Sequence, residues 1–370
     1  MSAILLGKCY LMTGIRRIIS IKSSTFRVIK LSIWIPILAI LFVLVICGSA
    51  EATIRWVVVN TNYHESPSKG FDRYILELKL NRLDNLVEDL GHVDVIFLGS
   101  SMVHRGLDPK LFQREIYTAT NHTITAFNLG IPGIKSKDAA SIARVLVQKY
   151  KPKLIIYGIS VRDFDGQYEA TGISDNPWMR YELGYFNLDG WLRDKSLAYQ
   201  YYLVYRNWMK VDFDAQIRQR QYYDRVITAK GFLNKDDVLQ EDPQAWKESA
   251  IKSYENYFLD LSYVNAVEAI LQLQEQGTKI VIVEMPVQNV FVQYYPHQWK
   301  DQEQFIQAIQ TVVSSFDTQF LPTTGIVTLP ENGWYTKNHL NSIGANVFTH
   351  WLAYQLVTST TIVQALIAGK

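Results

Sequence analysis

The sequence predicts an α/β protein: a doubly wound, mostly parallel sheet with a helical, aromatic-rich insertion, preceded by one N-terminal transmembrane helix. Three observations support this prediction. Short apolar runs alternate with segments of helical spacing, a long stretch rich in Tyr and Trp interrupts that alternation, and an uncharged apolar run lies close to the N-terminus. Strands that alternate with helices favour a parallel sheet covered by helices on both faces.

The uncharged run spans residues 31–50 (LSIWIPILAILFVLVICGSA) and is long enough to cross a bilayer as a helix. Several lysines and arginines precede it and no acidic residue occurs before Glu51, which predicts a cytoplasmic basic tail over residues 1–30. A cleaved signal peptide is the alternative, since residues 48–50 are small, but a 30-residue basic region is long for one. We expect an uncleaved, single-pass anchor in the cytoplasmic membrane. The remainder of the chain would then lie outside, in the periplasm or the extracellular space.

Charge and cysteine content exclude several classes of function. The formal net charge is only +2, which gives no basic footprint for nucleic acid. The two cysteines, Cys9 and Cys47, both belong to the anchor region. The outer part therefore has no disulfide, no cysteine nucleophile and no Cys-based metal site, and we expect neither a metal nor another cofactor.

The rest of the chain divides by pattern. Residues 51–92 are expected to form a helical linker, and the α/β core is expected in two parts, 93–164 and 262–370. Within the core the alternation predicts strands at 93–98, 124–129, 154–159 and 279–284, with 325–329 as a candidate fifth strand, and helices at 137–150, 302–316 and 341–356.

Residues 165–261 do not follow the alternation and are predicted to form a helical cap inserted after the third strand. Tyr and Trp residues crowd its first half. Packing between helices explains most such aromatics, whereas a stacking platform for sugar rings is the functional alternative. Both interpretations stay open on the sequence.

Two segments carry residues suited to nucleophilic chemistry. Ser100 and Ser101 follow Gly99 at the end of the first strand, where backbone N–H groups at a helix start can hold an oxyanion. A simple N-cap is the alternative interpretation. His339 lies just before the last helix, so it should reach the same sheet edge and could act as a general base to a serine hydroxyl.

Four blocks in this order resemble the SGNH (GDSL-like) hydrolases, over roughly residues 93–160 and 278–357. Gly99-Ser100-Ser101 resembles the Gly-Asp-Ser block, which implies Ser101 as the nucleophile. Asn128-Leu129-Gly130-Ile131-Pro132-Gly133 is similar to the second block, which implies that Gly133 donates its N–H to the oxyanion. Residues 157–163 occupy the third block, and His339 matches the histidine of the last block. The resemblance implies an SGNH, flavodoxin-like fold.

Two positions depart from the family pattern. The oxyanion asparagine of the third block is matched by Arg162, which could stabilise an oxyanion by charge or bind an anionic substrate. The aspartate three residues before the histidine is replaced by Thr336, which can accept a hydrogen bond and so orient the histidine but cannot balance an imidazolium charge. The site could then work as a Ser-His dyad, borrow another carboxylate to orient His339, or be inactive. The candidates for that carboxylate are Asp163, Glu284 and Glu331.

The neighbours of Ser101 one helical turn further on are His104 and Arg105. They could line the mouth of a pocket, but for Arg105 we expect a solvent-facing position.

Proteins of this superfamily that have one N-terminal anchor resemble the alginate acetylation proteins and the D-alanyl transfer protein of teichoic acid assembly. The resemblance implies a serine esterase or acyltransferase that acts on O-acyl groups of an envelope glycan, with acetyl as the first candidate. It also implies a multi-pass membrane acyltransferase as a partner, alongside the lipid bilayer. A non-catalytic SGNH-like binding or scaffold subunit in such a complex is the alternative, and a lipid esterase is a third possibility.

Overall fold

The computed structural model describes residues 34–61, 67–208, 213–238, 248 and 251–367, and the predicted basic tail lies outside these residues. The chain divides into two compact units, Met1–Glu65 and Ser66–Lys370. Each unit is described by itself.

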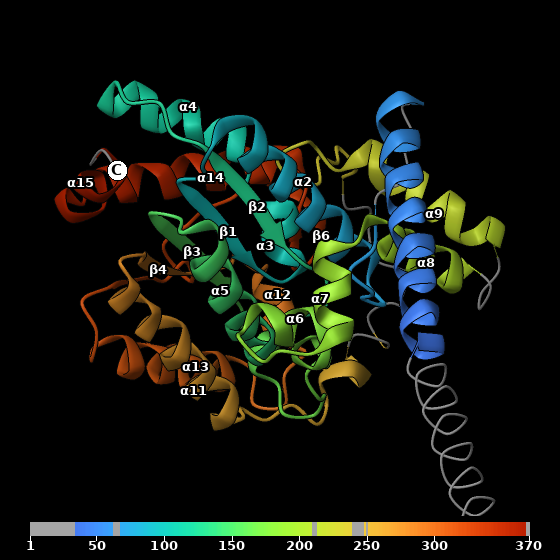
Figure 1. Ribbon diagram of the computed structural model, residues 1–370. Helices are drawn as coiled ribbons and strands as arrows, with labels where there is room; N and C mark the ends of the chain where they lie inside the picture. The colour runs from blue at the N-terminus through green and yellow to red at the C-terminus, as the bar shows by residue number, and fades with distance from the viewer. Residues whose placement is uncertain (1–33, 62–66, 209–212, 239–247, 249–250, 368–370) are drawn as a thin grey trace, which may run out of the picture. The chain divides into compact units, whose positions relative to one another are not determined.

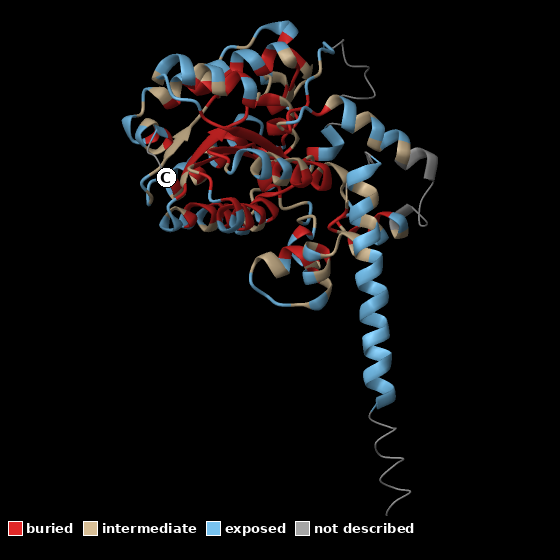
Figure 2. Ribbon diagram, turned by 45° about the horizontal axis from the view of Figure 1, so that its top comes forward, coloured by how far each residue is buried: buried red, intermediate tan, exposed pale blue. Residues whose placement is uncertain are grey.

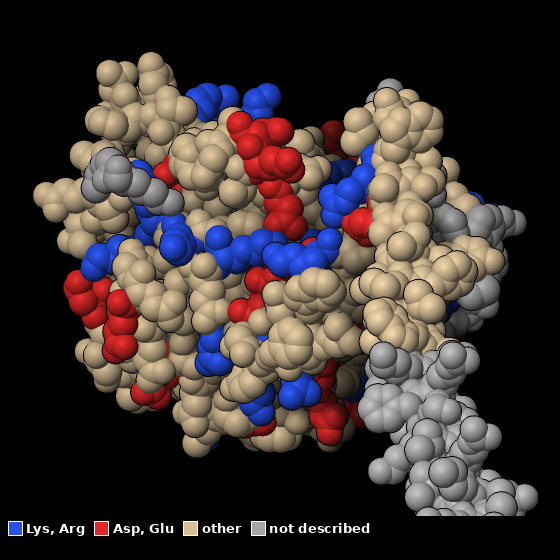
Figure 3. Space-filling view, in the orientation of Figure 1, with Lys and Arg blue, Asp and Glu red and all other residues tan. Residues whose placement is uncertain are grey.

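The described part of the first unit is one long helix, Trp34–Asn60. It is the one helix among the described residues that is long and apolar enough to cross a membrane, and none of its most apolar stretch is buried. In the space-filling view its surface is mostly free of Lys, Arg, Asp and Glu (Figure 3). Length and composition of this kind fit a single-pass anchor or a signal sequence. The described helix ends ten residues beyond the 31–50 run that predicts the anchor.

The second unit is built on a five-stranded parallel sheet (Figure 1). The strands are β1 (Val95–Gly99), β2 (Ala126–Gly130), β3 (Leu154–Ile159), β4 (Lys279–Glu284) and β5 (Gln319–Leu321), in the order β2-β1-β3-β4-β5. All four pairings are parallel, and Gly99 of β1 lies level with Gly130 of β2 and Gly158 of β3. The predicted α/β class with a parallel, doubly wound sheet is confirmed.

Helices cover both faces of the sheet. The first group packs against residues such as Ile96 and Leu98 and comprises α2 (Tyr74–Leu90), α5 (Ser136–Tyr150), α11 (Leu261–Leu271) and α13 (Trp299–Val313). The second group packs against Val95 and Phe97 and comprises α3 (Ser101–Gly106), α4 (Pro109–Thr120), α14 (Ser342–Val357) and α15 (Thr360–Ile367). Figure 2 shows the sheet buried between helices whose outer surfaces are exposed. Burial on both faces explains why the strands read as continuous apolar runs.

The remaining elements lie outside these two layers of helices. Between β3 and α11 lie α6 (Pro177–Glu182), α7 (Leu188–Lys195), α8 (Leu197–Trp208) and α9 (Phe213–Val226), and the later part of the chain adds α12 (Asn289–Val292), β6 (Trp334–Thr336) and β7 (His339–Leu340).

The predicted strand at 325–329 is wrong. The fifth strand is Gln319–Leu321, and Gly325 adopts the left-handed conformation with φ of 72°. The N–H groups of Ile326 and Val327 both donate to the carbonyl of Thr323, so this segment closes a turn. The apolar pattern alone did not reveal that the glycine would be used for a turn.

The segment predicted as a cap leaves and re-enters the core at one place. Phe164 accepts a hydrogen bond from the N–H of Asp260, and Gly166 donates to the carbonyl of Phe258. Its aromatics divide into two groups: Trp178 is fully buried against Phe71, whereas others are exposed, among them Tyr185, Trp191, Tyr202 and Tyr205. The buried tryptophan follows the packing interpretation, and the sugar-stacking interpretation of the exposed residues stays a prediction.

Candidate active site

The turn that carries Ser101 requires glycine at its first position. Gly99 has φ of 152°, and a Cβ built there would lie 2.4 Å from the carbonyl oxygen of Gly158 and 2.4 Å from Val103 Cγ2. Only a residue without a side chain lets β1 end this close to β3 and turn into α3. Ser101 is then the first residue of the helix and is partly exposed, at the carboxyl edge of the sheet.

The preceding residue, Ser100, occupies the N-cap position of α3, but its side chain makes no capping hydrogen bond. It is buried, and its hydroxyl lies 3.4 Å from Oδ2 of Asp163. Neither the Ser100 nor the Ser101 hydroxyl therefore caps the helix, so the N-cap interpretation does not explain the two serines.

The β6–β7 hairpin brings His339 to Ser101. The two strands are antiparallel, and Thr336 pairs with His339 across the hairpin. Nε2 of His339 lies 2.7 Å from Oγ of Ser101, although 238 positions separate the two residues in the sequence. A nucleophilic hydroxyl within hydrogen-bond distance of an imidazole is the arrangement needed for general-base activation.

On its other side the imidazole meets a hydroxyl. Nδ1 of His339 lies 2.8 Å from Oγ1 of Thr336, and that hydroxyl donates to Oδ1 of Asn338 at 3.0 Å. Because the Thr336 hydroxyl donates its proton to Asn338, the hydroxyl oxygen of Thr336 can accept a hydrogen bond from the Nδ1–H of His339. This order of donors leaves Nε2 as the acceptor for the Ser101 hydroxyl, which is the tautomer that a general base requires.

The carboxylates considered for orienting His339 are engaged elsewhere. Oδ2 of Asp163 accepts hydrogen bonds from the N–H and the hydroxyl of Ser160 at 3.0 and 3.1 Å. The carboxylate of Glu284 binds Gln302 and the backbone N–H groups of residues 323 and 324. Glu331 is exposed in a short 3-10 turn. Among the described residues, the hydrogen-bond partners of the imidazole are Ser101 and Thr336.

The environment of His339 keeps its imidazole neutral. Burial is the main cause, and the positive charges of Arg105 and Arg162 add to it, so the pKa of His339 falls to about 3. Desolvation and like charge both disfavour the imidazolium form. The imidazole is therefore neutral at physiological pH and able to accept a proton, and Thr336 would stabilise its protonated form less than a carboxylate partner would.

The solvent-facing position expected for Arg105 is wrong. Its guanidinium is stacked on the ring of Tyr335, 4.0 Å from the centroid, and burial lowers the pKa of Arg105. His104 is also buried, and burial lowers its pKa well below the usual value.

Arg162, the predicted oxyanion residue, is one-third exposed and lies 4.0 Å from Asp163. The positive charge of Arg162 acts on the site by lowering the pKa of His339.

The second block lies beside the same turn. The N–H of Ile131 donates to the carbonyl of Gly99 at 2.8 Å, which ties this loop to the end of β1. Gly133 has φ of 78°, and a Cβ there would lie 3.2 Å from Nη1 of Arg73. In the described part of the chain the N–H of Gly133 donates to no protein acceptor, so it can serve an oxyanion.

Two supporting residues were missed by sequence reasoning. Asn128 is fully buried, and its amide donates to the carbonyls of Val103 and Leu107 at 2.7 Å, which fixes the helix that carries Ser101 against β2. Lys79 is also fully buried and donates to Asn128 Oδ1 at 3.1 Å and to the carbonyl of Gly130. Burial lowers the pKa of Lys79 well below its usual value. For Asn128 the available signal was a polar residue inside the apolar run AFNLG, whereas Lys79 is one of four polar residues in LELKLNRL and does not stand out.

No group of three or more His, Cys, Asp or Glu side chains suited to a metal ion occurs among the described residues.

Comparisons with known proteins find similarity in structure only. No family model matches the sequence, and no curated protein matches it. A lipase/acylhydrolase from Enterococcus faecalis is similar with 10% identity and a TM-score of 0.38, over 72% of this chain and 96% of that one. An inhibitor-bound aryl esterase from M. smegmatis is similar with 9% identity and a TM-score of 0.34, over 72% of this chain and 99% of that one. A carbohydrate acetylesterase from Sinorhizobium meliloti is similar with 8% identity and a TM-score of 0.35, over 72% of this chain and 99% of that one. Values of this size assign no activity, so the case for a function comes from the site itself.

Proposed function

We propose that this protein is a membrane-anchored SGNH-like serine esterase or O-acyltransferase that acts on O-acyl groups, with acetyl as the first candidate, of an envelope glycan outside the cytoplasm. The observation that carries the proposal is the 2.7 Å contact between Ser101 Oγ and His339 Nε2, with Thr336 behind Nδ1. These residues supply a nucleophile, a neutral base and a group that fixes the base's tautomer.

The proposed reaction has two halves. Ser101 Oγ attacks the ester carbonyl carbon while its proton passes to Nε2 of His339. The tetrahedral intermediate then collapses, the glycan oxygen leaves with that proton, and the acyl group stays on Ser101. In the second half water, or an acceptor hydroxyl, gives its proton to His339 and attacks the acyl-enzyme. This releases a carboxylic acid or a new ester and restores the serine.

The oxyanion of this intermediate would be held by the backbone N–H groups of Ser101 and Gly133, with the charge of Arg162 nearby. Preorganised N–H donors are a major source of stabilisation for such intermediates. Arg105 and Arg162 disfavour the imidazolium form, and the same positive charges would favour an oxyanion. The replacement of the family's asparagine by Arg162 therefore does not remove electrostatic help from the site.

The glycan substrate and the membrane location rest on the helix Trp34–Asn60 together with the basic residues before it. An outward-facing domain close to the bilayer would meet envelope polymers, and a multi-pass acyltransferase is the partner that could supply acyl groups. Extraction of cell membranes with alkaline carbonate tests the anchor. The full chain should stay in the membrane pellet, and its release by carbonate would count against an uncleaved anchor.

The activity is tested with the full chain in detergent, on a small acetyl ester and on an acetylated glycan. Ser101→Ala should lower turnover by at least about 10³-fold, and His339→Gln should do nearly the same, because residues that act as one unit are not additive. Ser141→Ala removes a hydroxyl that only bonds within helix α5, so it is the matched control. Unchanged turnover in Ser101→Ala would remove the proposal.

A non-catalytic SGNH-like scaffold subunit is the second candidate, because Thr336 replaces the carboxylate that would balance a histidine charge. A serine-directed fluorophosphonate probe separates the two. The enzyme should be labelled at Ser101 in a way that depends on His339, whereas the scaffold should give no label in wild type.

A further inference from the structure

A cavity of about 410 Å³ lies beside the second block. Its lining joins the segment before α2, the Ile131–Pro132 turn and the helices α8 and α9. Pro132 immediately precedes Gly133, the residue proposed to hold the oxyanion. The cavity has the size of small-ligand sites in proteins, and nothing in the proposed reaction uses it.

Three arginines line the cavity: Arg73, Arg206 and Arg220. Arg73 donates through Nη1 to the carbonyl of Pro132 at 2.6 Å and lies close to Gly133. Arg220 is stacked on the ring of Tyr74, 4.7 Å from the centroid. Nε of Arg206 is buried and has no hydrogen-bond partner in the described part of the chain. A buried guanidinium donor without a partner is costly unless a ligand meets it.

Two acidic residues, Asp72 and Glu77, also line the cavity. Glu77 turns its carboxylate to its own loop: Oε1 accepts from the Ser68 hydroxyl and the N–H of Phe71, and Oε2 accepts from the N–H of Lys69. Asp72 is exposed and lies on the segment before α2. The lining therefore carries three guanidinium groups and one carboxylate that is not bound by its own loop, and outside the lining the charge of Asp189 also acts on Arg206.

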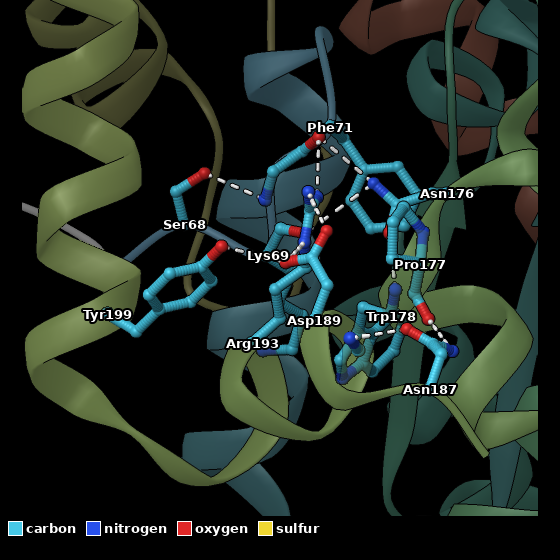
Figure 4. Close-up of polar contacts among 12 residues, drawn as sticks. Ser68, Lys69, Phe71, Asn176, Pro177, Trp178, Asn187, Asp189, Arg193 and Tyr199 are labelled. Carbon is cyan, nitrogen blue, oxygen red and sulfur yellow. Dashed lines mark hydrogen bonds and ion pairs between the residues drawn. The ribbon is translucent and has the colours of Figure 1, made fainter. Parts of the chain in front are cut away.

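The walls of the cavity are held firmly. Arg193 donates to the carbonyl of Lys69 and is itself bound by Asp189, and Asn176 donates to the carbonyl of Gly70 (Figure 4). These contacts fix the segment that carries Ser68, Phe71 and Arg73.

On the opposite wall α9 is tied to α2. The hydroxyl of Tyr74 donates to Asp224 at 2.9 Å, and Arg82 donates to Asp224 and to the carbonyls that follow α9. Fixed walls mean that the guanidinium groups are positioned before a ligand arrives, which lowers the entropic cost of binding.

We propose that this cavity is an anion-binding subsite for a carboxylate or phosphate group of an acidic envelope glycan, the same polymer that presents its ester to Ser101. Guanidinium groups match the planar, bidentate geometry of such anions. The contact of Arg73 with the Pro132–Gly133 turn connects the subsite to the oxyanion side of the active site. The inference rests on the proposed function for the identity of the reaction, but the subsite itself does not depend on that function.

The test compares two acetylated oligosaccharides that differ in charge, an oligouronate and its carboxyl-reduced, neutral counterpart. Full-length protein in detergent is assayed as wild type, Arg206→Gln and Arg220→Gln. Arg218→Gln is the matched control, since Arg218 is exposed on the same helix as Arg220. Arg206→Gln should raise KM for the acidic substrate by about tenfold, the value of one charge-assisted hydrogen bond, and leave KM for the neutral one unchanged. Turnover of a small acetyl ester should stay the same in all variants.

Binding separates failure of the subsite from failure of the enzyme. Calorimetry of the non-acetylated oligouronate with Ser101→Ala protein should show binding that Arg206→Gln weakens, even if no ester is hydrolysed. Equal affinity of wild type and Arg206→Gln for the acidic oligosaccharide would overturn the subsite. So would stabilisation of wild type over Arg206→Gln by anionic phospholipid and not by the oligouronate, because that result would make the cavity a lipid-headgroup site.

Discussion

Nδ1 of His339 lies 2.8 Å from the hydroxyl of Thr336, at the position where a Ser-His-Asp triad has a carboxylate. The geometry of a triad is therefore kept while its charge is lost. Thr336→Val removes the acceptor of the Nδ1 proton, and we expect a loss of about tenfold to a hundredfold in kcat/KM, the value of one buried hydrogen bond. Thr336→Ser keeps the hydroxyl and should stay within a few-fold of wild type. Equal activity of the Val and Ser variants would contradict a role for this hydroxyl.

The acid limb of the pH–rate profile should lie unusually low. The pKa of His339 is lowered to about 3 by burial, then by Arg105 and Arg162, and a base works only while unprotonated. We expect kcat/KM to be flat from about pH 5 to pH 8. Arg105→Met removes one of the positive charges, so the limb should move to higher pH. A limb near pH 6.5 in wild type would show that the imidazole is not shielded in this way.

Histidine burial should also make folding stability fall in acid. The pKa of His104 is lowered, first by burial and then by Lys79 and Arg105. As pH falls below the unfolded value of about 6.5, the unfolded chain binds a proton that the folded chain does not. Stability is therefore full above that pH and lost below it, by at most about 1.4 kcal/mol per pH unit for this group. Urea unfolding at pH 7 and pH 5 should show that His104→Leu is relatively more stable at pH 5, and an equal difference at both values would contradict the shift.

The turn before Ser101 should not tolerate any side chain at Gly99. A Cβ there meets Gly158 and Val103 at 2.4 Å, so Gly99→Ala should destabilise the fold by at least about 2 kcal/mol and abolish activity. Gly184→Ala is the control. Gly184 also has a positive φ, of 89°, but its missing side chain would meet nothing within 4 Å. A similar unfolding free energy for both variants would mean that the close approach of β1 and β3 does not matter.

The sequence predicted most of the sheet and the meeting of Ser101 with His339 at its carboxyl edge, because both follow from local patterns. The apolar runs of β1 to β4 are buried on both faces, and Ser101 and His339 follow strand-end and loop patterns that survive without tertiary information. The short strand β5 was misplaced because its three residues are only half-buried and carry little pattern.

What could not be predicted depends on contacts between distant segments. The guanidinium of Arg105 is stacked on the ring of Tyr335, which lies 230 positions further along the chain. Arg73 reaches the second block from the segment before α2, at a sequence distance of 59 residues. Neither side chain carries a local signal, since a surface arginine and a stacked arginine look alike in a sequence.

The same sequence distance has a consequence for biogenesis. Ser101 and His339 are 238 positions apart, and the β6–β7 hairpin that carries His339 is made after all five strands of the sheet. During synthesis Ser101 therefore emerges long before His339. A chain truncated before the hairpin would carry Ser101 without its histidine, so the proposed reactivity toward acyl groups would arise only when the whole second unit has folded.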